Sequence, residues 1–199
     1  LKGKQSFFAD IAGIRADVKV DLYIESTHVC SEQGELQLTN YGISGIPVFQ
    51  LSRVAARALS EQKKVYATLN FVPLWEKEQC LTYFKERFKK ADEKRIGEAL
   101  IGFFPEKLIP VLLEESHIKA AKYANRLQTE ELERFIDTVQ GLRVDITDWN
   151  TFDTAQVTAG GVDTDEIDAE TMESKLCPGL YFAGEMVDID GICGGYNLQ

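Results

Sequence analysis

Residues 15–24 read RADVKVDLYI, and this stretch sets the character of the first third of the chain. Every second residue from 18 to 24 is apolar, whereas most of the residues between them are polar. A period of two is typical of a β-strand with one buried face. The sequence therefore predicts that the chain begins as a β-rich unit.

Other segments continue this pattern on both sides of a helix. Strand character returns in three places, at residues 34–39, 64–72 and 142–147. The polar stretch at 31–34 suggests a hairpin turn before the first of them. Helical spacing at 49–59 begins just after Pro47, a residue that the first turn of a helix tolerates.

Composition changes at Pro73, and residues 73–140 have the period of amphipathic helices. Four apolar stripes are expected: Leu81, Phe84 and Phe88; Leu100, Phe103 and Phe104; Leu108, Ile109, Leu112 and Leu113; and Leu132, Phe135, Ile136 and Val139. For the fourth helix we expect Thr129 as the N-cap and Gly141 as a left-handed C-terminal residue. Because strand character resumes after this region, the helices are expected to be an insertion into the β-rich unit.

Charge and apolar patterning limit the classes of partner that the protein can bind. The 199 residues include 22 Lys and Arg and 32 Asp and Glu, a net charge of −10. A surface of that sign repels a phosphate backbone, so no nucleic-acid partner is expected. No apolar run approaches the ~18 residues of a membrane span, so no membrane partner is expected either. Four scattered cysteines without a CxxC pair indicate reduced thiols and a cytoplasmic location.

Several catalytic and metal-binding motifs are missing from the sequence. His28 and His117 are the only histidines, and neither has further ligands at zinc-site spacing, so no metal site is expected. The stretch Gly42–Gly45 is one residue short of a GxSxG nucleophile elbow. GxGxxG and GxxxxGK[ST] loops are absent, so this chain alone has no phosphate-cradling loop. No catalytic side chain is identified.

The most informative stretch is PGLYFAGE at 178–185, followed by MVDIDGICGGYN at 186–197. Glu185 follows an apolar segment and Gly184, and a carboxylate in such a place can accept hydrogen bonds from ligand hydroxyls. A Gly-Gly pair at 194–195 would let backbone N–H groups approach a ligand. The alternative is a buried strand followed by a glycine turn, and the residues alone favour that alternative.

This stretch resembles the second flavin-binding motif of two-dinucleotide-type flavoproteins, where a strand ends in Gly and an acidic residue that contacts the FAD ribitol. More narrowly, TAGGV at 158–162 and LYFAGEMVDIDGICGGYNLQ at 180–199 are similar to the BaiN/YhiN-type bacterial flavoproteins, which are NAD(P)/FAD-dependent oxidoreductases. Residues 41–45 (YGISG) and 50–52 (QLS) match the same family. That family usually has Pro directly after the second glycine, whereas this chain has Ile46 there.

The resemblance implies an α+β fold with a small β-barrel-like unit and an inserted helical subdomain. The barrel-like part would comprise residues 1–72 and 141–149, and the helical subdomain residues 73–140. Residues 150–199 would be a C-terminal fragment of a two-dinucleotide-type FAD-binding domain. Because the family begins with a GxGxxG half and continues beyond the position of Gln199, we expect an excised piece that does not bind FAD by itself.

The resemblance also implies which residues contact the cofactor. Glu185 beside Gly184 would hold the ribitol, and Gly160 and Gly161 would lie near the flavin. Four consecutive residues would place their backbone near the ring and chain of the flavin: Gly194, Gly195, Tyr196 and Asn197. In the full-length protein the implied partners are FAD and an unidentified small-molecule substrate, with NAD(P)H as the electron donor. The alternative is a non-catalytic protein-interaction module built on the barrel and the helices.

Overall fold

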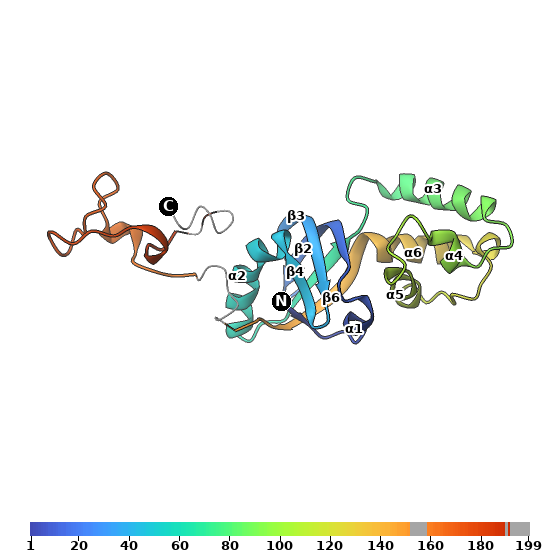
Figure 1. Cartoon of the computed structure of the whole chain (residues 1–199), viewed down its shortest axis with the longest axis horizontal. Helices are drawn as coiled ribbons and strands as arrows, with labels where there is room; N and C mark the ends of the chain where they lie inside the picture. Colours follow the sequence, from blue (N-terminus) through green and yellow to red (C-terminus); the bar gives the residue numbers. More distant parts are fainter. Residues whose placement is uncertain (152–158, 190, 192–199) are drawn as a thin grey trace. The chain divides into compact units, whose positions relative to one another are not determined.

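Six antiparallel strands close into a barrel in the first part of the chain (Figure 1). They are β1 (Lys2–Gly3), β2 (Arg15–Ile24), β3 (Thr27–Thr39), β4 (Gly42–Gly45), β5 (Val65–Asn70) and β6 (Leu142–Asp148). The order around the barrel is β1-β4-β3-β2-β5-β6, and β1 pairs with both β4 and β6 to complete the ring. The computed structural model describes residues 1–151, 159–189 and 191.

The barrel interior is filled by the apolar residues that alternate along the strands. Val18, Val20 and Leu22 of β2 have no exposed surface, and Leu36, Leu69 and Val144 are equally buried on β3, β5 and β6. Helix α1 (Phe8–Ile11) and helix α2 (Ile46–Ser60) pack against the strands through their own buried residues. The expected α+β class with a barrel is therefore confirmed.

The turn between β2 and β3 lies earlier than the sequence indicated. Ile24 pairs directly with Thr27, so the turn is Glu25–Ser26, and β3 runs without interruption through 31–34. Both turn residues have positive φ, 48° and 72°, which matches the right-handed twist of a two-residue hairpin. Nothing in the identity of Glu25 and Ser26 signals such a turn, whereas the polar stretch at 31–34 resembles one.

Two glycines of the YGISG stretch allow backbones to approach closely within the barrel. A Cβ atom on Gly42 would lie 2.3 Å from the Leu1 carbonyl oxygen, and one on Gly45 would lie 2.4 Å from the Glu35 carbonyl oxygen. Gly45 also has φ +103°, a conformation that residues with side chains rarely adopt. This motif is therefore explained by strand packing and by the entry into α2.

The chain between β5 and β6 forms the helical subdomain. Its helices are α3 (Lys77–Lys90), α4 (Ile96–Leu100), α5 (Leu108–Glu115) and α6 (Thr129–Gly141), with the 3₁₀ turn η1 (Ala124–Arg126) before α6. Barrel and helices fall within one compact unit, Leu1–Asp148, so the expected boundary between residues 72 and 73 stays a prediction. No helix among the described residues is long and apolar enough to span a membrane.

An aromatic cluster forms the core of the helical subdomain. The Phe84 ring is fully buried and lies between 4.9 and 6.1 Å from the rings of Phe103, Phe104 and Phe135, measured between centroids. Phe103 and Phe104 were expected on a helix, but α4 ends at Leu100 and they lie on the turn that follows. Their packing on Phe84 does not require helical backbone, since a tight turn presents both rings to the same core.

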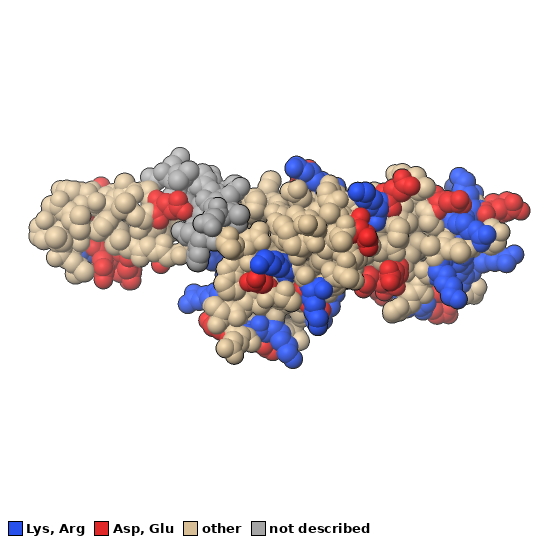
Figure 2. All heavy atoms as spheres, turned by 60° about the horizontal axis from the view of Figure 1, so that its bottom comes forward, with Lys and Arg blue, Asp and Glu red and all other residues tan. Residues whose placement is uncertain are grey.

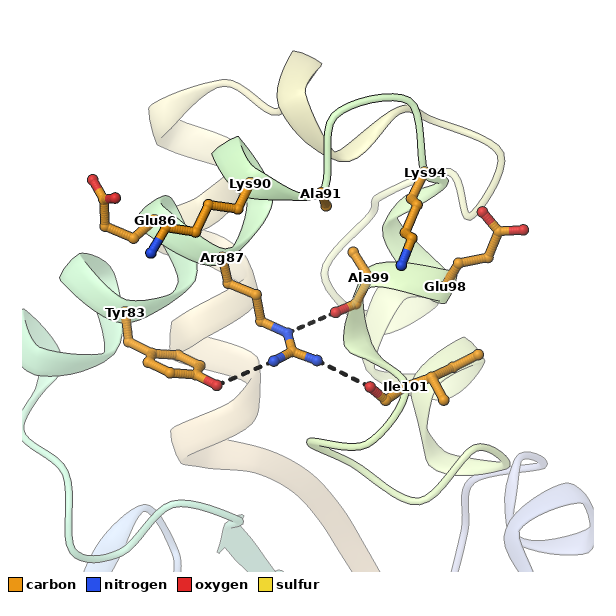
Figure 3. Close-up of a pocket in the computed structure, with 9 residues that line it drawn as sticks. All are labelled: Tyr83, Glu86, Arg87, Lys90, Ala91, Lys94, Glu98, Ala99 and Ile101. Atoms are coloured by element: carbon orange, nitrogen blue, oxygen red, sulfur yellow. Dashed lines mark hydrogen bonds between the residues drawn. The ribbon is translucent and has the colours of Figure 1, made fainter.

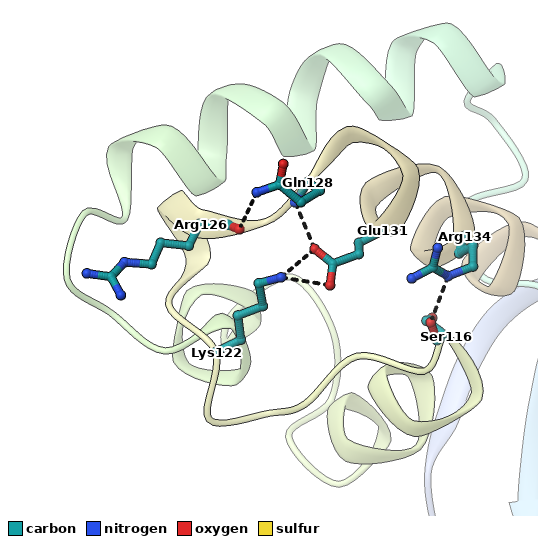
Figure 4. Close-up of polar contacts among 6 residues, drawn as sticks. All are labelled: Ser116, Lys122, Arg126, Gln128, Glu131 and Arg134. Carbon is teal, nitrogen blue, oxygen red and sulfur yellow. Dashed lines mark hydrogen bonds and ion pairs between the residues drawn. The ribbon is translucent and has the colours of Figure 1, made fainter.

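The start of α6 is fixed by a polar network (Figure 4). Glu131 accepts a hydrogen bond from the Gln128 backbone N–H at 2.8 Å and one from Lys122 Nζ at 2.7 Å. The N-cap is therefore Gln128 rather than the expected Thr129, because the acid three residues later binds the Gln128 N–H. The hydrogen bond from the Lys122 ammonium lowers the pKa of the Glu131 carboxyl group, and the bond from the Gln128 N–H lowers it further to a smaller extent.

Replacement of Gly45 by alanine should destabilise the barrel strongly. The new Cβ would collide with the β3 backbone and strain a positive φ, so we expect a loss of at least ~2 kcal/mol in the free energy of unfolding. Urea denaturation followed by circular dichroism measures it. Gly141→Ala is the matched control, since Gly141 ends α6 and open space surrounds it, and it should stabilise the protein by ~0.4–1 kcal/mol. Equal effects of the two substitutions would contradict the packing argument.

Replacement of Glu131 by glutamine should destabilise the protein in a pH-dependent way. Gln keeps an acceptor for the Gln128 N–H but loses the charge opposite Lys122, so we expect a loss of about 1 kcal/mol at pH 7. A carboxylate whose pKa is lowered by folding stabilises the fold above its unfolded pKa and loses that effect as pH falls through its folded pKa. The difference from wild type should therefore vanish in acid, whereas Glu133→Gln, at an exposed position, should show none at either pH.

Candidate functional site

Four of the eight predicted flavin-contact residues lie in the described part of the chain. Gly160, Gly161, Gly184 and Glu185 belong to the C-terminal unit, Trp149–Gln199. The other four, Gly194, Gly195, Tyr196 and Asn197, lie outside the described residues. We therefore consider the site from the first four.

The structure brings the two described glycine segments together. The Val162 N–H donates to the Met186 carbonyl at 2.8 Å, and the Asp188 N–H donates to the Val162 carbonyl at 3.0 Å. These bonds form a parallel bridge between Val162 and Val187, and the Val187 side chain is buried. Two segments more than twenty residues apart in sequence thus lie side by side, as contact with one ligand would require.

Gly161 makes this approach sterically feasible. A Cβ atom there would lie 2.5 Å from the Met186 carbonyl oxygen and 2.8 Å from the Asp188 nitrogen. At Gly160 the space that a Cβ would enter is open, and its φ is +101°. The TAGGV stretch therefore has one glycine packed against backbone and one facing open space, which fits a place where a ligand meets main chain.

Glu185 lies on a turn rather than at the end of a strand. Gly184–Met186 form a short 3₁₀ turn, η4, that begins with Gly184 at φ +72°. Before it, Tyr181 makes only an isolated bridge with Glu173, and the Phe182 N–H bonds to the Met172 carbonyl. The apolar segment bonds to turns of its own unit, and this is why it does not form the regular strand that the sequence suggested. The Glu185 side chain is half-buried.

Glu185 is the one titratable side chain among the four described flavin-contact residues. Within the described ranges, no group of three His, Cys, Asp or Glu side chains could hold a metal ion. His28 does have an acidic neighbour across the β2–β3 pair, with Nε2 3.4 Å from Asp21 Oδ1, which its sequence context did not indicate. A single carboxylate and a serine hydroxyl beside one histidine do not make a metal centre.

A pocket of about 410 Å³ lies in the helical subdomain between α3 and α4 (Figure 3). Its floor is built by Arg87, whose Nε donates to the Ala99 carbonyl at 2.6 Å. Arg87 Nη1 donates to Tyr83 Oη at 3.1 Å, and Nη2 donates to the Ile101 carbonyl at 2.9 Å. Lys90 and Lys94 line the same pocket. We call it the α3–α4 pocket. The apolar stripes predicted the packed faces of these helices, but nothing in their spacing predicted the pocket.

A second pocket, of about 230 Å³, lies where the chain leaves the barrel for the helices. Residues 71–75, Phe103 and Asp17 line it, so its walls are largely apolar and aromatic. Trp75 packs edge-on against Phe103 at 5.6 Å between ring centroids. Sequence patterning placed residues 64–72 on a strand and Phe103 on a helix, and it gave no sign that the two met.

The acidic charge of the chain is unevenly distributed. Leu1–Asp148 contains 21 Lys and Arg and 22 Asp and Glu, whereas Trp149–Gln199 contains one Lys and ten Asp and Glu. Figure 2 shows the same contrast on one face: acidic side chains predominate on the C-terminal unit, whereas basic and acidic side chains lie together over the helical subdomain. Nine of the ten net negative charges thus belong to the C-terminal unit.

Comparison with known proteins identifies the family. Residues 1–157 match the model of the HI0933-like protein barrel and H2TH domain. A 3-dehydro-bile acid delta(4,6)-reductase of Clostridium scindens is 44% identical over 199 residues, which cover 100% of this chain and 49% of that protein. Ribosomal RNA dihydrouridine synthases of Escherichia coli and Haemophilus influenzae are each 30% identical, over 94% and 90% of this chain and 44% and 43% of theirs.

The chain spans about half the length of these curated relatives. The family match covers the barrel and the helices, and the similarity to the reductase continues through the whole C-terminal unit. Fold and sequence agree on the same assignment. The chain therefore belongs to the HI0933-like, BaiN/YhiN-type family, as its C-terminal motif predicted.

Proposed function

We propose that this chain is part of an FAD-dependent oxidoreductase that adds hydrogen across a carbon–carbon double bond conjugated to a carbonyl group. The observation that carries the proposal is the 44% identity to a delta(4,6)-reductase along the entire chain. The other relatives are named for the synthesis of dihydrouridine, which is also the saturation of a double bond beside a carbonyl. The relatives therefore support the proposed reaction type more firmly than they support either substrate.

FAD, when bound, would supply the hydride-transfer chemistry, and the protein would supply position and electrostatics. Glu185 would accept hydrogen bonds from ribitol hydroxyls, since an ionised carboxylate is an acceptor only. Gly160 would admit the ligand to the backbone, while Gly161 keeps the two segments in contact. The run from Gly194 to Asn197 would add backbone contacts, and NAD(P)H would be the electron donor.

The exposed apolar surface of the C-terminal unit supports a role in a larger domain. Ile167 and Val187 are the buried hydrophobic residues among its described positions. Six large apolar side chains are exposed instead, Trp149, Leu176, Leu180, Tyr181, Met186 and Ile189. Exposed apolar groups of this kind mark surfaces that other segments cover. We therefore propose that residues 150–199 complete an FAD-binding domain of a longer, cytoplasmic protein and that they do not retain FAD alone.

Two substrate classes share the proposed chemistry. One is a small conjugated ketone, in line with the reductase, and the other is a uridine in RNA, in line with the synthases. A non-catalytic interaction module, the alternative raised by the sequence, would not require the paired glycine segments in the C-terminal unit. The measurements below distinguish an enzyme from such a module.

Replacement of Glu185 by alanine in the full-length protein should weaken FAD binding about 10- to 100-fold. Loss of hydrogen bonds to a charged acceptor removes about 1.5–3 kcal/mol, and 1.4 kcal/mol corresponds to a factor of ten. Titration of apoprotein with FAD, followed by flavin fluorescence, gives both dissociation constants. Glu170→Ala, at an exposed acidic position of the same unit, should leave the affinity unchanged. Equal affinities of wild type and Glu185→Ala would remove Glu185 from the site.

The proposed reaction is tested by anaerobic reduction and reoxidation of the full-length flavoprotein. After reduction by NADPH, we expect the flavin to be reoxidised by a steroid with a carbonyl-conjugated double bond or by a uridine-containing RNA. The product should carry two additional hydrogens at that double bond, as mass spectrometry would show. A steroid whose double bond is isolated from any carbonyl serves as the control. Reoxidation by oxygen but by none of the conjugated substrates would contradict the proposal.

A further inference from the structure

The α3–α4 pocket holds hydrogen-bond donors that the fold does not use. An arginine side chain has five N–H donors, and three of those of Arg87 bond to Tyr83, Ala99 and Ile101. The other two N–H donors, one on each terminal nitrogen, have no hydrogen-bond partner among the described residues. The guanidinium is held at three points, so these donors keep a fixed direction at the floor of the pocket (Figure 3).

Two lysines add charge to this site. Lys90 closes α3, and Lys94 reaches over the pocket from the loop before α4 (Figure 3). Neither ammonium group has a hydrogen bond or an ion pair among the described residues. The partial negative charge at the end of a helix accounts for a lysine at position 90, but not for Lys94, which lies beyond the helix.

Two acidic side chains, Glu86 and Glu98, also line the pocket and offset part of this charge. The Glu98 carboxylate accepts the Arg95 backbone N–H at 2.8 Å, as part of the cap of α4. Glu86 forms no ion pair with Lys90 within 4.0 Å, and Figure 3 shows its carboxylate directed away from Arg87. Lys85 and Lys89 extend the basic surface along the exposed side of α3. The pocket lining therefore carries three cationic and two acidic side chains, a net charge of +1, and the exposed Asp92 and Glu93 lie in the loop beside it.

The net charge of the whole chain does not describe this surface. Sequence reasoning excluded nucleic acid because of a net charge of −10, but Leu1–Asp148 carries only one unit of that excess. Surface electrostatics decay over about 8 Å at physiological ionic strength, so local charge decides whether a phosphate is attracted. Residues 85–98, at this end of the helical subdomain, include six Lys and Arg and four Asp and Glu, a local excess of two positive charges.

We propose that the α3–α4 pocket binds a backbone phosphate of RNA, with the free donors of Arg87 at its floor and Lys90 and Lys94 at its rim. Planar guanidinium donors suit phosphate oxygens, and a rim of flexible lysines suits a polyanion that extends past the pocket. The proposal rests on the proposed function in that the bound RNA would present the uridine to be reduced.

The test is RNA binding by the chain itself, measured by fluorescence anisotropy with a labelled RNA hairpin that has a uridine-rich loop. The double variant Lys90→Gln/Lys94→Gln should bind about 10-fold more weakly than wild type at 0.1 M salt. Its plot of log K against log salt should be shallower by about 1.4, the value for two lost single-strand phosphate contacts. The double variant Lys107→Gln/Lys119→Gln, at exposed positions of the same subdomain, is matched in charge and should bind as wild type does.

The other outcomes are equally informative. Equal losses in both double variants, or no RNA binding by wild type at low salt, would overturn the proposal. Calorimetric titration with inorganic phosphate tests the alternative source of the anion, and phosphate binding without RNA binding would also overturn it. Since binding needs no flavin, RNA binding through Lys90 and Lys94 in a protein without reductase activity would refute the proposed function and leave this site standing.

Discussion

The pairing of β5 with β6 is the constraint on which the architecture depends. Leu69 near the end of β5 faces Leu142 at the start of β6, so the chain leaves the barrel and returns to it at adjacent points. The Phe71 N–H then bonds to the Val139 carbonyl, and the Gln140 side chain bonds to the Trp75 carbonyl. Because hydrogen bonds hold the segment after β5 against the segment before β6, a long helical insertion can separate these two strands in sequence without opening the barrel.

The barrel and the helical subdomain bury different kinds of side chain. The barrel core is made of aliphatic side chains from alternating strand positions, whereas the helical core is made of stacked and edge-on aromatic rings around Phe84. The two sets of buried residues join in one continuous hydrophobic core, because α6 packs against β5 and β6. The helical subdomain can therefore present a charged surface at its far end while the barrel keeps a fixed frame.

The sequence predicted the features that depend on periodicity and missed those that depend on tertiary contact. Alternation identified β2, and the stripe through Phe84 identified α3, because burial imposes the period of the element. The turn at Glu25–Ser26 escaped notice because strand pairing, rather than residue preference, imposes its backbone conformation. The same holds for the cap at Gln128, which is set by a side chain three residues later. Family resemblance singled out Gly160 and Gly161, but only the structure showed that Gly161 lies against residues 186–188.

The three hydrogen bonds of Arg87 reduce the conformational entropy that this side chain would lose when a ligand binds. A flexible side chain that is immobilised on binding loses rotamer entropy worth about 0.5–1.5 kcal/mol. Arg87 has already lost that freedom in folding, since two helix-end carbonyls and the Tyr83 hydroxyl hold it in place. A ligand that meets its remaining donors therefore encounters a rigid partner between mobile lysines. The specificity of such a surface would come from the immobile guanidinium, and its long-range attraction from the side chains that still move.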